Sequence, residues 1–587
     1  MNRDERITSP TYEFGPFQID VGQRRLSKNE REVSLTPKAF DLLLALVKNN
    51  GQLLSRTDLL KILWPDVYIE TCNLTQTVFA LRQALGEKHG THQYIQTVPK
   101  YGYRFIASVK NQVPGAKPKL HKPRDPMSRI SLAILPFVNE ASNPEIDYLC
   151  EGLTETLIKN LSPLQNLDLK AHSSVLRYRK QIPNLRAIRR DLSVSIVLIG
   201  RITVRGEQVV VNTELVDTVH ERQLWSERYE RRFSRLTELQ QGLANDITDQ
   251  LGVKLSKKER SLLSKRYTDN IEAYRLYLKG RFYWNKYKVQ SMLQAIEYFE
   301  QAIQLDSNYA LAYAGMADAY FRLSTNYLFP SETIPKAEAA VKKALSIDPA
   351  LAEAHASLGI LKLRYEWNGD AADKEFKKAI SLNPGYATAH HWYSHYFVAQ
   401  CKFDEAFQHL RIALDLDPLS MQIPLSWGTA LWKMRRFDAA LEKYREVVAM
   451  DPTYYPARTS LAVVLGDSGK FDESLAEFSK LGALGESGLV SAFYGYVLGI
   501  AGRRSEARRI LREVTTERTK KYVPAYGVAL LYVGLHQPDA AFKWLEISYR
   551  ERDELLTWLA SDPRFDILRS DPRYKELIRR VGLCKSA

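Results

Sequence analysis

The chain has 587 residues, of which 45% are hydrophobic and 26% are charged. This balance is typical of globular proteins and excludes wholesale disorder. The formal net charge of +15 suits an anionic partner, such as nucleic acid or a membrane surface, without choosing between them.

The sequence shows no targeting or membrane segment. The first residues, MNRDERITSPTYEF, are charged and lack the apolar stretch of a signal peptide. The longest apolar runs, at 40–47 and 525–535, are shorter than the roughly 18 residues that cross a bilayer. The four cysteines form no CxxC pair, which argues against a zinc site or a disulfide framework and fits a reducing compartment. We therefore expect a soluble, cytoplasmic protein with no membrane partner.

Residues 10–109 alternate strand-like runs with helical periodicity. Thr36 and Pro37 signal the start of a helix, because a threonine hydroxyl caps free backbone N–H groups and proline fits the first helical turn. The predicted elements are strands at 12–20 and 31–35, helices at 37–49, 55–63 and 73–85, and a hairpin of strands at 94–98 and 103–109.

The helix predicted at 73–85 has two different faces. Leu74, Val78, Leu81 and Leu85 are spaced as one apolar stripe, which we expect to face the core. The opposite face carries amide, hydroxyl and aromatic groups and no acidic residue, which suits the major groove of DNA. The residues predicted to contact DNA from this helix are Asn73, Thr75, Gln76, Phe79, Arg82 and Gln83.

Three of these residues have alternative interpretations. Arg82 can pack within the domain or contact phosphate instead of reading a base, and Gln83 can be solvated. Phe79 is unusual on an exposed helix face, where its partner is either a thymine methyl group or another protein.

The hairpin after this helix is predicted to form a basic wing. Lys100, Tyr101 and Arg104 lie at or beside its turn, from which they can reach phosphate groups or the minor groove. Gly102 and Tyr103 are expected to serve the turn and the core rather than DNA.

The stretch at 12–109 resembles the OmpR/PhoB-type winged helix, in the variant found in ToxR- and CadC-like one-component regulators. The segments that carry the resemblance are VSLTPKAF at 33–40, LRQALG at 81–86 and TVPKYGYRF at 97–105. The resemblance implies a four-stranded N-terminal sheet, three helices of which the last is the recognition helix, and a C-terminal wing. No phosphoacceptor domain precedes this stretch and no membrane helix follows it, so we expect a soluble regulator that aspartate phosphorylation does not trigger.

A linker and a second domain follow. Residues 110–127 are rich in proline and lysine and predict an extended linker. Residues 128–255 predict an α/β domain that resembles the FlgO/TolB N-terminal-like domain, in the segments LPF at 135–137, EGLTE at 151–155, VLIG at 197–200 and LWSE at 224–227. Glu151 and Glu155 lie four apart on a predicted helix, where a solvated face is favoured over a pair of catalytic carboxylates.

The C-terminal half repeats a helical pattern every 34 or 35 residues, which is the tetratricopeptide period. In each copy two small residues flank a large one, as in Ala372, Phe376 and Ala379, so that paired helices can approach closely. The matching small positions in the preceding helices are Gly359, Ser394, Gly428 and Ala462. Residues 270–587 are therefore predicted to form an all-α solenoid of about seven to eight repeats, capped by a helix at 575–581.

The sequence contains none of the common catalytic or cofactor signatures, such as a P-loop, GxGxxG, HExxH or GxSxG. His391 and His395 lie four apart on a predicted helix, but no cysteine or carboxylate stands in register, so a helix surface or groove is favoured over a metal site. We predict that the protein is not an enzyme and has neither a cofactor nor a metal.

These features predict a multidomain protein with a winged helix-turn-helix (α+β), a central α/β domain and a C-terminal solenoid. Its predicted function is sequence-specific transcriptional regulation, in which the winged helix binds double-stranded DNA. The solenoid would bind a protein, a peptide or a small effector, with RNA polymerase as a further partner by analogy. The competing function is an adaptor or scaffold whose winged helix mediates protein contacts.

Overall fold

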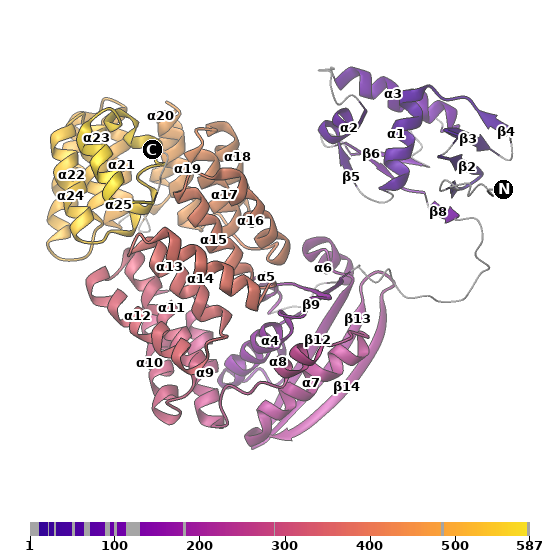
Figure 1. Ribbon diagram of the computed structural model, residues 1–587, viewed down its shortest axis with the longest axis horizontal. Helices are drawn as coiled ribbons and strands as arrows, with labels where there is room; N and C mark the ends of the chain where they lie inside the picture. Colours follow the sequence, from indigo (N-terminus) through magenta and orange to yellow (C-terminus); the bar gives the residue numbers. More distant parts are fainter. Residues whose placement is uncertain are drawn as a thin grey trace, which may run out of the picture. The chain divides into compact units, whose positions relative to one another are not determined.

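In the computed structural model the chain divides into two compact units, residues 1–124 and 125–587 (Figure 1). The residues that the structure describes are 11–21, 23–28, 31–49, 53–63, 71–87, 94–98, 102–107, 109–112, 129–179, 184–286, 288–482 and 487–583.

The N-terminal unit combines two small sheets with three helices. The strands are β1 (Thr11–Phe14), β2 (Phe17–Asp20), β3 (Arg25–Lys28), β4 (Arg31–Val33), β5 (Leu53–Ser55), β6 (Ile95–Val98), β7 (Gly102–Phe105) and β8 (Val109–Gln112). The helices are α1 (Pro37–Lys48), α2 (Arg56–Leu63) and α3 (Thr71–Ala84). One sheet has the strand order β4-β3-β2-β1-β8 and the other has the order β5-β7-β6. This is a winged-helix arrangement in which β6 and β7 form the wing.

The start of α1 follows from its sequence. Thr36 Oγ1 accepts a hydrogen bond from the backbone N–H of Ala39 at 3.3 Å, and Pro37 occupies the first helical turn, as predicted. Leu42 and Leu43 of this helix are fully buried in a core that also contains Leu81 of α3. The capping residues therefore set where α1 begins, and its apolar side holds it in the domain.

The strands differ from the prediction in three places. The single strand predicted at 12–20 is two strands, because the chain turns at Gly15, whose φ is +52°. The strand predicted at 103–109 ends at Phe105, and β8 instead pairs antiparallel with β1. The first sheet therefore has five strands rather than four, and residues 110–112 lie in it rather than in the linker. The remainder of the predicted linker lies outside the described residues.

The C-terminal unit begins with a mixed sheet. Its strands are β9 (Ile130–Ile134), β10 (Val138–Asn139), β11 (Leu167–Leu169), β12 (Ile196–Arg205), β13 (Gln208–Asp217) and β14 (Arg222–Arg232). The order is β11-β9-β12-β13-β14, with β10 beside β12; β9, β11 and β12 are parallel, and β13 and β14 continue as an antiparallel meander. The helices of this part are α4 (Asp147–Leu161), α5 (His172–Val175), α6 (Leu185–Leu192), α7 (Leu236–Gln250) and α8 (Lys257–Leu263).

The rest of this unit is a solenoid of paired antiparallel helices (Figure 1). The pairs are α9 (Ile271–Trp284) with α10 (Val289–Leu305), α11 (Ala310–Asn326) with α12 (Pro330–Ile347), α13 (Ala352–Arg364) with α14 (Gly369–Leu382), α15 (Ala387–Ala399) with α16 (Phe403–Leu416), α17 (Gln422–Lys433) with α18 (Phe437–Met450), α19 (Tyr455–Asp467) with α20 (Phe471–Ser479), α21 (Gly488–Ile500) with α22 (Arg504–Arg518), and α23 (Ala525–Gly534) with α24 (Pro538–Arg550). Two 3₁₀ helices, η5 (Glu554–Trp558) and η6 (Pro563–Leu568), and the final helix α25 (Pro572–Val581) complete the chain.

Glycine lies where a ring from the partner helix enters the helix pair. A Cβ atom on Gly428 of α17 would lie 2.7 Å from the ring of Tyr444 of α18, and one on Gly359 would lie 2.9 Å from Phe376. Both rings are fully buried. The alternation of small and large residues in the repeats thus has the packing role that the sequence predicts.

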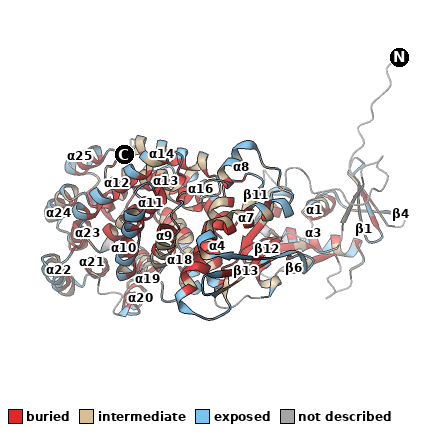
Figure 2. Cartoon of the chain, turned by 90° about the horizontal axis from the view of Figure 1, so that it is seen from below, coloured by how far each residue is buried: buried red, intermediate tan, exposed pale blue. Residues whose placement is uncertain are grey.

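The α/β part and the solenoid share one core. A single cluster of buried apolar residues runs from Leu132 in β9 to Ala354 in α13, and buried residues continue through both parts (Figure 2). Glu155 of α4 accepts a hydrogen bond from Arg281 Nε of α9 at 2.7 Å, and Glu151 pairs with Arg179 at the same distance. The prediction that these glutamates form a solvated face is therefore wrong, because each has an arginine partner distant in sequence. Burial raises the pKa of Glu155, but Arg281 together with His172 and Asn285 outweighs this effect and holds the pKa below its usual value.

The glycine packing gives the first testable expectation. We expect Gly428→Ala to destabilise the C-terminal unit by about 1–3 kcal/mol, because the added methyl group would overlap the buried Tyr444 ring. The matched control is Gly242→Ala in α7, where a Cβ would meet no atom within 4 Å. Differential scanning calorimetry of the full chain should show a lower Tm for the first variant only. Equal Tm values for both variants would contradict the packing argument.

Candidate nucleic-acid interface

The apolar face of α3 holds this helix in the N-terminal unit. Leu74, Val78 and Leu81 are at most 2% exposed, and α3 contacts both α1 and α2. This stripe is the one that the helical spacing predicts, so its burial fixes the rotation of α3 about its axis. The other side of the helix must then face outward.

The outward side of α3 carries most of the helix residues predicted to contact DNA. The exposed members of that set are Asn73, Thr75, Gln76, Phe79 and Gln83. Phe79 is 53% exposed, which is unusual for so large an apolar side chain. No acidic residue lies between Thr71 and Ala84, so the surface presents amides, hydroxyls and one ring without negative charge.

The guanidinium of Arg82 bonds within the domain, which is one of the alternatives that the sequence left open. Its Nη2 donates to the backbone carbonyl of Ile95 at 2.7 Å and to Thr97 Oγ1 at 2.8 Å. Its Nε lies 3.2 Å from the carboxylate of Glu87. These bonds tie the recognition helix to β6 of the wing. Arg82 is therefore better described as a positioning residue than as a residue that contacts DNA.

Glu87 completes this connection, and the sequence analysis did not identify it. Its side chain is 1% exposed, and its Oε1 accepts hydrogen bonds from the backbone N–H groups of Tyr94 and Ile95, the latter at 2.9 Å. Glu87 follows Gly86, whose φ of +76° turns the chain away from the helix axis. Because helical spacing does not relate Arg82 to a residue beyond the helix end, no sequence pattern pointed to this pair.

The wing is an antiparallel hairpin that packs closely on β5. Gly102 faces Val98 across the pair, and a Cβ at Gly102 would lie 2.0 Å from the carbonyl oxygen of Leu54. Tyr103 is 3% exposed. Gly102 and Tyr103 thus serve the turn and the core, as the sequence predicts.

Of the three wing residues predicted to contact DNA, the structure describes Arg104. Arg104 is half-buried on β7, between the buried Tyr103 and Phe105, so its side chain emerges on the opposite face of the small sheet. Its Nε is buried and has no hydrogen-bond partner among the described residues. Lys100 and Tyr101 lie outside the described residues, so their DNA contacts stay predictions.

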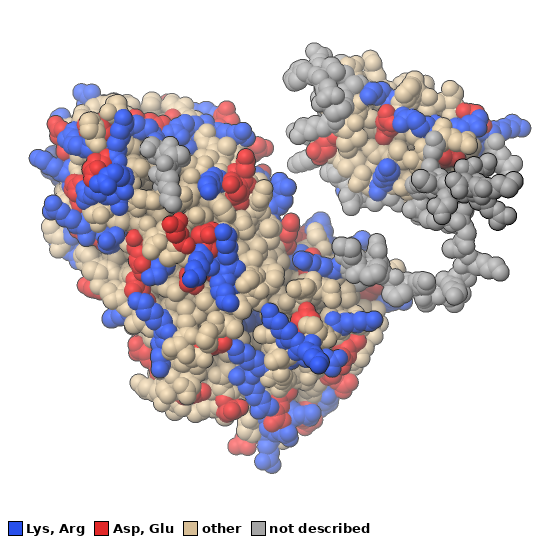
Figure 3. Space-filling model, viewed as in Figure 1, with Lys and Arg blue, Asp and Glu red and all other residues tan. Residues whose placement is uncertain are grey.

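Positive charge is unevenly shared between the two units. Residues 1–124 contain 19 lysines and arginines against 11 aspartates and glutamates, an excess of eight in about a fifth of the chain. On the face of the C-terminal unit in Figure 3, by contrast, basic and acidic side chains alternate. The N-terminal unit therefore contributes more than its share of the +15 net charge.

No group of three or more histidine, cysteine, aspartate or glutamate side chains within the described part of the chain could hold a metal ion. His391 Nε2 and His395 Nε2 both lie within hydrogen-bond distance of Ser426 Oγ, at 2.8 and 3.2 Å, and burial lowers the pKa of both imidazoles well below the usual value. Every helix in the described ranges is too short or too polar to span a lipid bilayer.

Three segments of the chain match models of known protein families. Residues 30–105 match the model described as the C-terminal domain of transcriptional regulatory proteins. Residues 128–246 match the second domain of HilA/YgeH-like transcriptional regulators, and residues 425–486 match a tetratricopeptide repeat.

Individual relatives are similar over part of their length. The transcriptional regulator HilA of Salmonella typhimurium (strain LT2) is 24% identical over 365 residues, which cover 60% of this chain and 61% of HilA. A Rhizobium meliloti protein with the provisional name adenylate cyclase 3 is 29% identical over 187 residues, 32% of each chain. The solved DNA-binding domain of Escherichia coli CadC is 29% identical, covers 18% of this chain and 97% of that domain, and gives a TM-score of 0.17. The chain thus spans about a third to three fifths of the length of the two relatives.

The class of each part follows from the fold and these matches. The chain carries an OmpR/PhoB-type winged helix of transcriptional regulators, a HilA/YgeH-like second domain and tetratricopeptide repeats. The resemblance of the second domain to the FlgO/TolB type stays a prediction.

Arg82 gives a test of how the wing is positioned. We expect Arg82→Met to increase amide hydrogen exchange in residues 94–98, because the variant removes two hydrogen bonds and an ion pair while keeping most of the side-chain volume. Gln83→Met, one position along and exposed, should leave this exchange unchanged. Mass spectrometry of the full chain measures both. An unchanged exchange rate in the Arg82 variant would show that the wing is held by other contacts.

Proposed function

We propose that the chain is a sequence-specific DNA-binding transcriptional regulator of the one-component type. In this proposal α3 enters the major groove of double-stranded DNA, and the wing contacts the backbone beside it. The solenoid binds an effector, and RNA polymerase is a further partner. This function requires no catalytic group and no cofactor. Because its partner is chromosomal DNA, the proposed site of action is the cytoplasm.

The outward face of α3 is the observation that carries the proposal. Gln76 offers the paired donor and acceptor that recognise adenine, and Asn73 and Gln83 offer the same group on the same side. The exposed ring of Phe79 can contact a thymine methyl group, which would bury a side chain that is otherwise left in water. The proposed contact set is therefore Asn73, Thr75, Gln76, Phe79 and Gln83 from α3, with Lys100, Tyr101 and Arg104 from the wing.

The matches to regulators support this function. The family models at 30–105 and 128–246 both describe transcriptional regulators, and the transcriptional regulator HilA matches 60% of this chain. The charge excess of residues 1–124 also suits a polyanion, since neutralised phosphates contribute most of nonspecific DNA affinity.

A scaffold is the second candidate function, and the exposed Phe79 is the observation that favours it. An aromatic ring on a helix face is also a common anchor for another protein. The two functions differ in what the neighbouring amides do. A protein interface centred on Phe79 does not require Gln76, whereas base recognition does.

We expect the full chain to select a defined motif from randomised duplex DNA. Gln76→Ala should weaken binding to the selected motif by about 1–3 kcal/mol and relax the base preference at one position, because one bidentate base contact is lost. Binding to unrelated DNA should be unchanged. Gln18→Ala, an exposed glutamine on β2, is the matched control and should bind as the wild type does.

Salt dependence separates the outcomes. Binding that yields no motif and disappears as salt rises would mean attraction to the phosphate backbone alone, and the regulator proposal would be abandoned for the scaffold. If Gln76→Ala binds the selected motif as the wild type does and Phe79→Ala does not, the base contacts are made by residues other than Gln76.

A further inference from the structure

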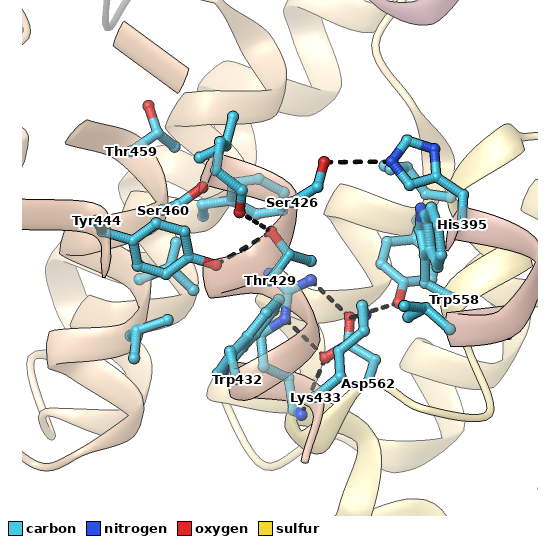
Figure 4. A pocket seen from close by; sticks show the side chains of 18 of the residues that line it. His395, Ser426, Thr429, Trp432, Lys433, Tyr444, Thr459, Ser460, Trp558 and Asp562 are labelled. Carbon is cyan, nitrogen blue, oxygen red and sulfur yellow. Dashed lines mark hydrogen bonds and ion pairs between the residues drawn. The ribbon is translucent and has the colours of Figure 1, made fainter. Parts of the chain in front are cut away.

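The solenoid contains a cavity of about 260 Å³ that is partly open to solvent (Figure 4). Helices α15, α17 and α19 line one side of it, and residues of η5 and η6 line the other. α17 presents Ser426, Thr429 and Lys433 to the cavity because residues spaced three and four apart share one helix face. The cavity is therefore built by repeats far apart in sequence together with the end of the chain.

The segment 554–568 closes this cavity from the inside of the solenoid. Glu554 accepts a hydrogen bond from Arg364 Nη1 at 2.9 Å, and Asp562 accepts one from the Tyr526 hydroxyl at 2.7 Å. These bonds hold the protein's own chain against α13 and α23. A cavity of this volume suits a small molecule.

The walls of the cavity are mainly apolar and aromatic. Trp432, Phe493 and Trp558 line it, and Trp432 Nε1 donates to Asp467 Oδ2 at 2.9 Å, which fixes the orientation of that indole. Polar side chains also line the cavity, with Lys433 beside Asp562 at one place and Thr459 beside Ser460 at another (Figure 4). An apolar cavity with a few separate polar groups is the usual form of a small-molecule site.

Lys433 and Arg564 share one carboxylate, that of Asp562, in the cavity wall. Arg564 binds Asp562 through two hydrogen bonds, from Nε at 2.9 Å and from Nη2 at 2.6 Å. Lys433 is 3% exposed, and its Nζ lies 4.0 Å from the same carboxylate, which Arg564 already occupies. Nζ also lies 5.0 Å from the ring centroid of Trp432 and 5.4 Å from that of Trp558, so this buried ammonium group faces two aromatic rings and a carboxylate that it shares with Arg564.

Two further buried groups in the cavity wall lack partners. Arg364 Nε and Thr459 Oγ1 have no hydrogen bond among the described residues, and Thr459 is 7% exposed. A buried donor without a partner costs free energy, and native structures contain few of them. Arg364 Nε can only donate, and the Thr459 hydroxyl can donate or accept.

We propose that this cavity binds a small organic anion, namely a carboxylate on an apolar body. Because benzene fills an engineered cavity of about 150 Å³, a cavity of about 260 Å³ suits a ligand of roughly ten to twelve heavy atoms. Lys433 Nζ contacts the carboxylate, and the rings of Trp432 and Trp558 contact the body. The role of this anion as an effector rests on the proposed regulatory function, but its binding does not.

The first test compares three ligands that share a phenylpropyl body and differ in charge. We expect 3-phenylpropanoate to bind the full chain with 1:1 stoichiometry in isothermal titration calorimetry. The uncharged 3-phenylpropanamide and the cationic 3-phenylpropylamine should bind about tenfold more weakly or less, because neither supplies an anionic acceptor. Equal affinity for the amide, or no saturable binding of the acid by folded protein, would overturn the proposal.

The second test removes the ammonium group. Lys433→Met should weaken 3-phenylpropanoate binding about tenfold or more, while Lys378→Met, an exposed lysine of α14, should stay within about twofold of wild type. Thr459→Val keeps the side-chain shape and removes a hydroxyl without a partner, so it should fold normally and weaken binding less. Circular dichroism and Tm values establish that each variant is folded. If folded Lys433→Met protein binds 3-phenylpropanoate with wild-type affinity, the assignment of Lys433 Nζ as the group that contacts the ligand's carboxylate is wrong.

The pH dependence of anion affinity provides a third test. Burial lowers the pKa of Lys433 to about 8, and the Asp562 carboxylate partly opposes this shift. The titratable or charged groups facing Lys433 are Asp562, Arg564, Arg435 and Cys401. Since the ammonium loses its proton as pH rises through this pKa, anion affinity should fall between about pH 7 and about pH 9.5 in wild type but not in Lys433→Met.

Failure of this inference is distinguishable from failure of the proposed function, because calorimetry uses no DNA. A selected DNA motif without anion binding would refute only the cavity assignment. Anion binding without a DNA motif would refute the regulator and leave the ligand site in place.

Discussion

Close approach between paired helices is the constraint on which the C-terminal unit depends. The ring of Phe299 packs against both Gly280 and Gly315, so one side chain sets the spacing of three consecutive helices. The ring of Tyr444 does the same against Gly428. Because a buried ring is nearly incompressible, it fixes both the distance and the relative rotation of the helices it separates. The stacking of the repeats, and the positions of the side chains that line their inner surface, follow from these contacts.

The same packing makes the HilA/YgeH-like domain and the solenoid one body. The ion pair between Glu155 and Arg281 is one link, and Ser174 Oγ adds another by bonding the carboxylate of Asp417 in the loop after α16. A ligand that tightens the solenoid would therefore act on the whole unit rather than on one repeat. The proposed DNA-reading surface lies on the other unit, where the buried leucine stripe of α3 leaves the opposite face for bases. The two proposed functions, DNA binding and ligand binding, therefore belong to units with separate hydrophobic cores.

Local patterns predicted much of this structure. The Thr36 cap, the two faces of α3 and the repeat period depend on residues a few positions apart, so they can be read from the sequence. The Arg82 connection to the wing and the Glu155 partner could not, because each depends on residues that meet only after folding. The strand at 109–112 was also missed, since its polar residues resemble a linker until β1 supplies its hydrogen bonds. The segment 554–568 has no repeat period, so its role in closing the cavity becomes apparent only in three dimensions.

The central claim is that α3 reads DNA bases, and site-specific photo-cross-linking tests it most directly. The photoreactive residue p-benzoylphenylalanine replaces Phe79, which already presents an aromatic ring to solvent. The full chain is then irradiated with its selected duplex, and the cross-linked base is mapped. The account predicts a cross-link to a single base pair within the motif, and none from the same residue placed at Gln18. Cross-links only to protein, or spread evenly over the duplex, would contradict base reading by α3.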